Sequence, residues 1–311
     1  ATAHSNLGVT LQELGRLEDA EASYNQAVVL NPSYAEVHYN LGNLLKELGR
    51  LDEAAASYIR AIAIKSDYAE AHSNLGATLE GLGRFDEAQA SYVQAIALKP
   101  GYAEAHYNLG VALQKQGKLH EAVASFRHAI LLKPNYADAH INLGDALKNQ
   151  GKLSEAEAKY ARMVELKPEH AEARFRLGLT QQEQGKLVKA MANYRRAIAI
   201  APNNSRYHNN LGNTLKDSGK IDDARASYTR AIALKPNSGR AHYNLGLTLQ
   251  EQGELEAAVA SYTKAITVKP RFAEAYSNLG TVLRDQSKLD DALANFKQAI
   301  ALKPDYAEAY Y

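Results

Sequence analysis

The hydrophobic and polar positions of this chain recur every 34 residues, so the sequence can be written in rows that begin at residues 1, 35, 69 and so on. Position 7 of the row is Leu and position 8 is Gly in all nine complete rows, and position 20 is always Ala. Position 24 is Tyr or Phe throughout. Self-similarity at a fixed period of this length predicts an architecture built by stacking one supersecondary unit.

Within each row the pattern predicts two helices. Apolar residues or His recur at positions 3, 4, 7, 11 and 14 with helical spacing, and positions 20, 24, 27 and 28 form a second apolar stripe. Gly at position 15, as in Gly49, suits a left-handed cap at the end of the first helix. Asp at position 18, as in Asp52, suits an N-cap of the second helix. All eight prolines lie at position 32, where they end the second helix.

Composition and charge narrow the classes of protein. With 311 residues and 46% hydrophobic content the chain can bury a core, which argues against disordered and fibrous classes. Lys plus Arg number 36 against 35 for Asp plus Glu, so no global charge points to nucleic acid or membrane partners. The absence of cysteine excludes disulfides, thiolate metal sites and a cysteine nucleophile. No apolar run approaches the ~18 residues of a spanning helix and no signal peptide is visible, so we expect an intracellular, cytoplasmic protein.

The repeated pattern resembles the tetratricopeptide repeat over essentially the whole chain. The residues that carry the resemblance are, in the second row, Leu41, Gly42, Ala54, Tyr58 and Ala61. The resemblance implies an all-α fold, a right-handed superhelical solenoid of antiparallel helix pairs whose first helices line the concave face. It predicts nine tandem repeats in one solenoid over residues 1–306 and the start of a truncated tenth repeat over residues 307–311. The chain departs from the family at position 4, where a large aromatic is usual and His stands in seven rows.

Position 6 carries the candidate binding residues. At ~100° per residue, positions 2, 6, 9 and 13 of the first helix lie opposite the core stripe of positions 7 and 11. Position 6 is Asn in eight rows and Arg in the sixth, and these residues are Asn6, Asn40, Asn74, Asn108, Asn142, Arg176, Asn210, Asn244 and Asn278. Helices packed ~10 Å apart would place one such side chain about every third residue of an extended peptide, which rises ~3.3 Å per residue.

A primary amide has both the donors and the acceptor that a peptide backbone requires. The row of asparagines resembles the ladder in the tetratricopeptide arm of O-linked N-acetylglucosamine transferases, and this resemblance implies that the asparagines bind substrate peptides through the backbone. The alternative is that duplication copied the asparagine, or that it bonds to a neighbouring repeat.

Other candidate sites are weaker. The geometry argues against a zinc ion shared by the position-4 histidines, because a zinc needs several nitrogens within ~2.1 Å and equivalent positions are separated by whole helices. They are interpreted as half-buried packing residues. No phosphate loop, catalytic triad or zinc spacing is present, so no catalytic residue, cofactor or metal site is predicted. Position 5 contains no Lys, which argues against the carboxylate clamp that holds chaperone tails.

The sixth row is the exception in the series. It has Arg174 at position 4, Arg176 at position 6 and Gln181 at position 11, and the preceding row has Met163 in place of Ala. One interpretation is a compensated packing change between Met163 and Gln181. The other is that Arg176 binds an acidic or phosphorylated ligand, because Arg binds carboxylates and phosphates in a bidentate manner.

The function predicted from the sequence is a non-enzymatic scaffold that binds an extended peptide or a partner protein in the concave groove. Two alternatives remain open. The first is the substrate-recruiting arm of a glycosyltransferase. The second is a structural module that self-associates end to end, because such arrays usually close with a polar cap and none is visible in this sequence.

Overall fold

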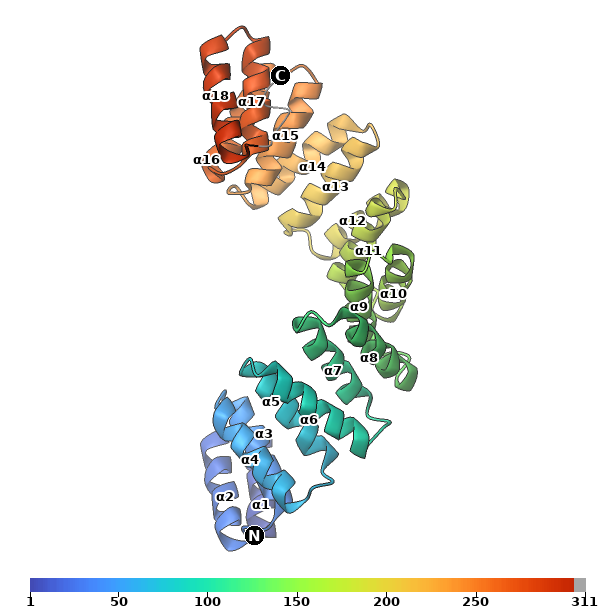
Figure 1. Ribbon diagram of the computed structural model, residues 1–311, viewed down its shortest axis with the longest axis vertical. Helices are drawn as coiled ribbons and strands as arrows, with labels where there is room; N and C mark the ends of the chain where they lie inside the picture. Colours follow the sequence, from blue (N-terminus) through green and yellow to red (C-terminus); the bar gives the residue numbers. More distant parts are fainter. Residues whose placement is uncertain (305–311) are drawn as a thin grey trace. The chain divides into compact units, whose positions relative to one another are not determined.

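The computed structural model describes residues 1–304, which form eighteen α-helices and no strand (Figure 1). The first helices of the nine repeats are α1 (Thr2–Glu13), α3 (Ala35–Glu47), α5 (Ala69–Gly81), α7 (Ala103–Lys115), α9 (Ala137–Asn149), α11 (Ala171–Glu183), α13 (Ser205–Asp217), α15 (Gly239–Glu251) and α17 (Ala273–Asp285). The second helices are α2 (Leu17–Leu30), α4 (Leu51–Ile64), α6 (Phe85–Leu98), α8 (Leu119–Leu132), α10 (Leu153–Leu166), α12 (Leu187–Ile200), α14 (Ile221–Leu234), α16 (Leu255–Val268) and α18 (Leu289–Leu302). The predicted start of a tenth repeat, residues 307–311, lies outside the described residues.

The chain divides into two compact units, residues 1–159 and 160–311, with the boundary inside α10. From α1 to α8 each first helix packs against the second helix of its own repeat, and each second helix packs against the first helix of the next repeat, as far as α9. First helices also contact one another in series, from α1 to α9. The second unit repeats this arrangement from α11 to α18. An all-α solenoid of helix pairs is therefore confirmed, while its handedness and its continuity as one solenoid over residues 1–306 stay predictions.

The end of each first helix follows the predicted glycine cap. Eight glycines at position 15 have φ between 71° and 77°, and in the ninth repeat Ser287 takes the same left-handed conformation with φ of 62°. In the second repeat the Gly49 amide donates to the Lys46 carbonyl at 3.0 Å and the Arg50 amide donates to the Leu45 carbonyl at 2.9 Å. These two bonds satisfy carbonyls that the helix end would otherwise leave unpaired.

The start of the second helix differs from the prediction. Helix α4 begins at Leu51, so Asp52 lies inside the first turn and is not an N-cap, and the preceding Arg50 makes no capping bond. Asp52 and Glu53 still favour the helix, because negative charge in the first turn opposes the helix dipole. Arg50 instead pairs with Glu53 at 2.6 Å and with Glu21 of the preceding repeat at 2.8 Å. The cap prediction was wrong, because the N-cap position is Arg50, two residues before Asp52.

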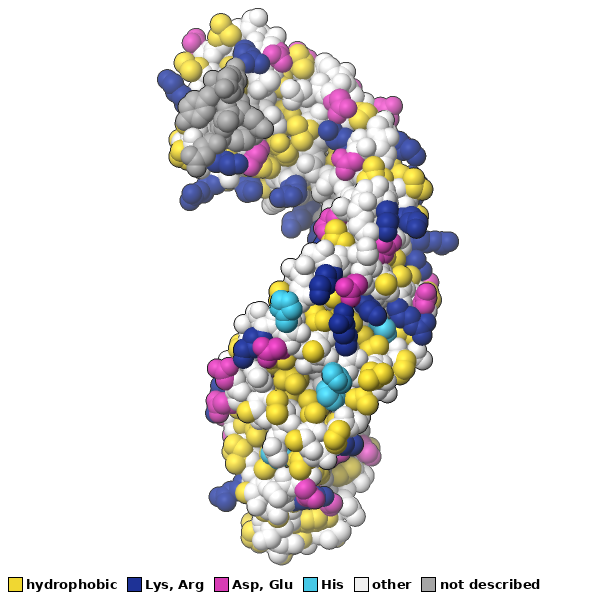
Figure 2. Space-filling model, turned by 45° about the vertical axis from the view of Figure 1, so that its right-hand side comes forward, with side chains coloured by type: hydrophobic (Ala, Val, Ile, Leu, Met, Phe, Trp, Pro, Cys, Tyr) yellow, Lys and Arg dark blue, Asp and Glu magenta, His cyan; other side chains and the backbone are white. Residues whose placement is uncertain are grey.

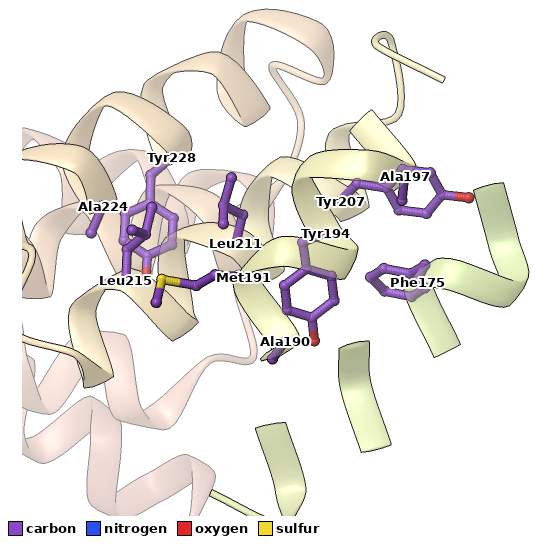
Figure 3. Packing of buried hydrophobic residues seen from close by; sticks show 10 residues of the cluster. All are labelled: Phe175, Ala190, Met191, Tyr194, Ala197, Tyr207, Leu211, Leu215, Ala224 and Tyr228. Carbon is purple, nitrogen blue, oxygen red and sulfur yellow. The ribbon is translucent and has the colours of Figure 1, made fainter. Parts of the chain in front are cut away.

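The core is built from the predicted stripe of the second helix together with the invariant glycine of the first. A Cβ atom added to Gly76 would lie 2.8 Å from the ring of Tyr92, which is fully buried. The glycine is required because the aromatic ring passes directly over the backbone of the first helix. In the second unit Phe175 continues this packing, with ring centroids 5.6 Å from Tyr194 and 4.7 Å from Tyr207 (Figure 3).

The surface carries charge of both signs. Basic and acidic side chains are interspersed on the face shown in Figure 2, which agrees with the balanced composition. Within residues 1–304 the structure contains no helix that combines the length and the apolar character needed to cross a membrane.

Candidate functional site

The inner face is defined here as the surface formed by positions 2, 6, 9 and 13 of the first helices. Asn6 of α1 is exposed, and the other eight position-6 residues, Arg176 among them, are half-buried. Half-burial follows from the contacts between successive first helices within each unit, which place the middle of one helix beside the next. The side chains at position 6 can therefore reach both a neighbouring repeat and solvent.

Four of the asparagines donate hydrogen bonds to the preceding repeat. The side-chain Nδ2 atoms of Asn142 and Asn278 each lie 2.9 Å from a hydroxyl, that of Tyr107 and of Tyr243 respectively. Asn74 Nδ2 donates to the Tyr39 hydroxyl at 3.1 Å. The fourth bond of this kind runs from Asn244 Nδ2 to Asn209 Oδ1 at 3.2 Å.

The residue at position 5 of the preceding repeat determines whether the asparagine is bonded in this way. Where Ser5 and Ser73 occupy that position, the next asparagines, Asn40 and Asn108, have side chains that form no hydrogen bond within the described part of the chain. In the seventh repeat the preceding position 5 is a phenylalanine, and Asn210 bonds to a carbonyl of its own helix at 2.9 Å. The inner face therefore contains asparagines tied to the preceding repeat and, at Asn40 and Asn108, open asparagines, while Asn210 is bonded within its own helix.

A second asparagine strengthens the tie in the third repeat. Asn43 Oδ1, at position 9 of the second repeat, accepts from Asn74 Nδ2 at 2.9 Å and from the Tyr58 hydroxyl at 2.7 Å. Burial raises the pKa of Tyr58 above the ordinary tyrosine value, so the phenol keeps its proton and donates at neutral pH. Because both Asn74 donor contacts run to the preceding repeat, the atom that remains for a ligand is the acceptor Asn74 Oδ1.

The eighth repeat has the same arrangement and a cavity beside it. Asn213 Oδ1 accepts from Asn244 Nδ2 at 2.9 Å and from the Tyr228 hydroxyl at 2.8 Å. A cavity of about 290 Å³ opens on the inner face across α11, α13 and α15. Its lining residues are Gln182, Asn213, Lys216, Asp217, Tyr228, Asn244 and Leu247.

The sixth repeat arranges its inner face differently. Arg176 Nε lies 3.2 Å from Glu172 of the same helix, and Glu172 also pairs with Arg206 at 3.2 Å and accepts from the Tyr207 hydroxyl at 3.1 Å. Burial and the Glu172 charge raise the pKa of Tyr207 to about 12, which keeps this hydroxyl a donor. Arg206 also lies over the ring of Phe175, 4.6 Å from its centroid. Arg176 is thus engaged with an acid of its own repeat, and its role toward an acidic ligand stays a hypothesis.

The packing interpretation of the sixth row also remains open. Met163 and Gln181 are both buried. Gln181 Oε1 accepts a hydrogen bond from Asn193 at 2.9 Å, so the polar group of Gln181 is satisfied inside the repeat. This bond accommodates a polar side chain where the other repeats have an apolar one.

From the second to the eighth repeat the position-4 side chain bonds to the backbone between repeats. His242 Nε2 lies 2.9 Å from the carbonyl of Pro236, and the equivalent histidines from the second to the eighth repeat make the same contact. In the sixth repeat Arg174 Nε donates to the Pro168 carbonyl at 2.8 Å. Among the described residues no group of three or more potential metal ligands occurs. The histidines are half-buried or buried as predicted, and their hydrogen bond is a role that the sequence did not suggest.

Sequence reasoning also missed the partners of the asparagines, at positions 5 and 9. One signal was present: Asn occurs at position 9 only in the second and seventh repeats, as Asn43 and Asn213. Position 9 lies three residues after position 6 and four after position 5, so it borders both on the helix surface, because residues three or four apart are neighbours there. An asparagine that recurs beside the position-6 row would have indicated a polar network between repeats.

Comparisons with known proteins agree with this geometry. Models described as TPR repeat match residues 10–49, 42–83, 81–117, 113–151, 212–253, 249–283 and 280–311, and models described as tetratricopeptide repeat match residues 141–205 and 193–226. The chain belongs to the tetratricopeptide-repeat (TPR) family. No curated protein sequence matches this TPR protein.

Several solved structures are similar to this TPR protein. YrrB, described as a TPR protein with an unusual peptide-binding site, is 28% identical with a TM-score of 0.51, over 58% of this chain and 92% of YrrB. MamA is 26% identical with a TM-score of 0.50, over 54% of this chain and 98% of MamA. PilF of Pseudomonas aeruginosa is 20% identical with a TM-score of 0.58, over 67% of this chain and 95% of PilF, a likeness of fold alone. TPR repeats typically form non-catalytic scaffolds for protein interaction.

Proposed function

We propose that this TPR protein is a non-enzymatic scaffold that binds an extended peptide, or an extended segment of a partner protein, along its inner face. The observation that carries the proposal is the recurrence of a primary amide at position 6 of eight repeats. The amides of Asn40 and Asn108 have no hydrogen-bond partner within residues 1–304, so their donors and acceptor are available to a peptide backbone. The tied asparagines still present an acceptor oxygen.

Backbone recognition suits this face because an amide row can hold an extended chain at intervals without reading every side chain. YrrB, which is similar to this chain in fold and in part of its sequence, has an unusual peptide-binding site. That likeness supports peptide binding by this chain, and the residues that perform it are proposed from the geometry of its own inner face.

The experiment that tests the proposal is selection of binders from a random peptide library displayed on phage, followed by titration of synthetic hits. We expect the double variant Asn40→Ala/Asn108→Ala to bind the hits more weakly, by about two- to tenfold per asparagine, because each open amide forms about one net hydrogen bond with the peptide. Thermal unfolding should be nearly unchanged, because neither side chain bonds within the fold.

The matched control is Gln94→Ala, which removes a primary amide from the exposed surface of α6. Hits that bind equally to the double variant and to the control would show that the asparagines do not carry binding. A library that yields no binder to the wild-type chain would contradict the proposal that this chain binds peptides.

The role as a recruiting arm of a glycosyltransferase and the end-to-end self-association both stay predictions. Light scattering over a range of protein concentrations tests the second. A mass that stays at 34.0 kDa per particle would contradict self-association.

A further inference from the structure

The residues that line the inner-face cavity of the second unit have counterparts in the first unit, five repeats earlier in the sequence. The cavity residues Gln182, Asn213, Lys216, Asp217, Tyr228, Asn244 and Leu247 correspond to Gln12, Asn43, Lys46, Glu47, Tyr58, Asn74 and Ala77. Five of the seven are identical, the acid is kept as Glu or Asp, and the last pair changes from Ala in the first unit to Leu in the second. We call the set in residues 12–77 the first site and the set in residues 182–247 the second site.

The hydrogen bonds of the two sites are the same. Each site has the tyrosine-to-asparagine and asparagine-to-asparagine bonds described above, at 2.7 and 2.9 Å in the first site and 2.8 and 2.9 Å in the second. In each site a glutamine also donates to the acid of the next repeat, from Gln12 to Glu47 at 2.7 Å and from Gln182 to Asp217 at 3.3 Å. No other repeat has Asn at position 9, so the sequence forms this set twice.

The polar atoms left for a ligand are of two kinds. In Asn74 and in Asn244 both hydrogen bonds of the side-chain Nδ2 go to the preceding repeat, so the Oδ1 atom of each remains as an acceptor for a peptide N–H. Lys46 and Lys216 lie three residues beyond the bonded asparagine on the same helix, which places a cation one turn away on that face. The acid beside each lysine is already bonded to the glutamine.

The volume of the cavity limits what it can hold. At about 290 Å³ it lies at the lower end of the range for small-molecule sites. Leu247 forms an apolar wall against which the methylene groups of a side chain can pack. The cavity suits one side chain and its flanking backbone better than a whole small-molecule ligand.

We propose that the inner face carries two equivalent sites, one in each unit, and that each binds an acidic side chain of an extended peptide together with a neighbouring backbone N–H. The lysine pairs with the carboxylate, and the asparagine Oδ1 accepts from the backbone. This inference rests on the proposed peptide-binding function and adds to it the chemical class of side chain that is recognised.

The two sites also differ in the acid that faces the lysine, and this difference ranks them. Lys216 pairs with Glu251 of the next repeat at 3.2 Å. The position equivalent to Glu251 in the first unit is Gly81, and Lys46 has no acidic partner within residues 1–304. The first site therefore binds an acidic side chain more tightly, because its lysine has no acid to exchange for the ligand.

The probe for the test is the capped peptide acetyl-(Thr-Glu)-repeat amide, in which the β-branched threonines favour an extended chain. The isosteric Thr-Gln peptide serves as the neutral probe. Isothermal titration calorimetry at low salt should show two peptides bound per chain with unequal affinity, and weaker binding of the Thr-Gln peptide.

Variants assign the two binding events. Lys46→Ala should abolish the tighter event and Lys216→Ala the weaker one, and both replaced lysines lie on the surface of a helix, so the fold is retained. Glu251→Gln should increase the affinity of the weaker event by about two- to fivefold. In this variant Lys216 no longer has to break its surface ion pair with Glu251 before it pairs with the peptide carboxylate. The matched control is Lys148→Ala, which removes the position-12 lysine of the fifth repeat, where position 9 is Asp145.

The outcomes separate this inference from the function on which it rests. A chain that binds library peptides but binds the Thr-Glu and Thr-Gln probes equally would overturn the inference and leave the proposed function standing. One bound peptide per chain, or a loss on Lys148→Ala equal to that on Lys46→Ala, would also overturn it. A chain that binds neither probe nor any library peptide would contradict both.

Discussion

The third repeat, residues 69–102, and the sixth, residues 171–204, share the packing of glycine against tyrosine and have different inner faces. In both, a glycine at position 8 lies under a fully buried tyrosine, and a Cβ on Gly76 or Gly178 would approach the ring of Tyr92 or Tyr194 to 2.8 Å. At position 6 the third repeat has an amide bonded to the repeat before it. The sixth repeat has Arg176 bonded to an acid that also contacts the repeat after it.

This difference shows that packing and surface chemistry vary independently along the chain. The stripe at positions 8, 20, 24 and 27 determines how the two helices pair. The inner face varies without disturbing that pairing, because its residues contact other repeats and solvent. If the inner face binds the peptide as proposed, a change of ligand specificity requires substitutions on that face alone.

The largest expected effect tests whether the two cores are equivalent. Gly76→Val and Gly178→Val should each lower the free energy of unfolding by about 3 kcal/mol, because the new side chain overlaps a ring that is buried on all sides. Urea unfolding monitored by circular dichroism measures the loss. Gly101→Val is the control, because no atom lies within 4 Å of a Cβ at Gly101. A loss at Gly76 without one at Gly178 would break the equivalence.

The second prediction concerns alkaline pH. Burial, with a contribution from a nearby glutamate, raises the pKa of Tyr92 and of Tyr194, so the folded state keeps protons that the unfolded state loses above about pH 10. The contribution of each of these tyrosines to the free energy of unfolding is thus fully present below about pH 10. It falls as the pH rises toward the folded pKa, and each tyrosine lowers the free energy of unfolding by about 1.4 kcal/mol per pH unit in that range.

Tyr92→Phe and Tyr194→Phe should each remove one such increment from the slope of unfolding free energy against pH. The replacement fits the site, because Phe126 and Phe296 occupy the same position in other repeats. Chemical unfolding at a series of pH values between 9 and 11 gives the slopes. Slopes equal to that of the wild-type chain would contradict the prediction.

The third prediction sharpens the distinction between tied and open asparagines. Asn74→Ala should destabilise the chain by about 1 kcal/mol, because Tyr39 and Asn43 each lose a hydrogen-bond donor. Asn108→Ala should change stability by less than about 0.5 kcal/mol, as is usual for surface positions without a partner. Equal losses in thermal unfolding for the two variants would show that the asparagines are not of two kinds.

The fourth prediction addresses the ion pairs of the sixth repeat. Glu172→Gln removes the negative charge that faces Arg176 and Arg206 and should cost about 0.5–1 kcal/mol at low salt. The cost should shrink as salt is added, because exposed charges are screened. Thermal unfolding of the variant and wild type at low and high salt measures it, and a cost independent of salt would contradict an electrostatic origin.

The smallest expected effect compares position 4 of the two repeats. Burial lowers the pKa of His72, so its contribution to stability is present above the ordinary histidine pKa and is lost as the pH falls through the folded value. Arg174 has the same carbonyl contact in the sixth repeat and keeps its charge throughout. His72→Arg should reduce the fall in melting temperature between pH 7 and pH 5. The reduction should be smaller than the drop in melting temperature that Asn74→Ala causes at a single pH. An unchanged fall would exclude His72 as its source.

Much of the fold was predictable because it depends on local rules that every repeat obeys. The period, the pairing of helices, the buried Tyr58 stripe and the glycine at Gly49 follow from helical spacing and backbone preference. The start of the second helix was missed because Asp52 satisfies the rules for a cap and for a first-turn residue alike. Backbone geometry decides between them, and it begins α4 at Leu51.

The candidate site was predictable only in part, because its chemistry depends on distances between repeats. The face that carries Asn74 and Asn108 follows from the helical angle. Whether each amide is tied depends on the residue that the preceding helix places opposite, Tyr39 in one case and Ser73 in the other. The helical angle alone does not predict which residue of the preceding helix lies opposite each asparagine.

The bond between position 4 and the carbonyl of position 32 has a consequence for the history of the chain. It joins residues only six apart, such as Pro236 and His242, although they belong to different repeats. Excision or duplication of any whole number of 34-residue units recreates the same junction wherever the following unit has His or Arg at position 4, as the second to eighth repeats do and the ninth, with Tyr276, does not. Copy number can therefore change in a single genetic event without loss of this junction, and one side chain, His or Arg, suffices to close it.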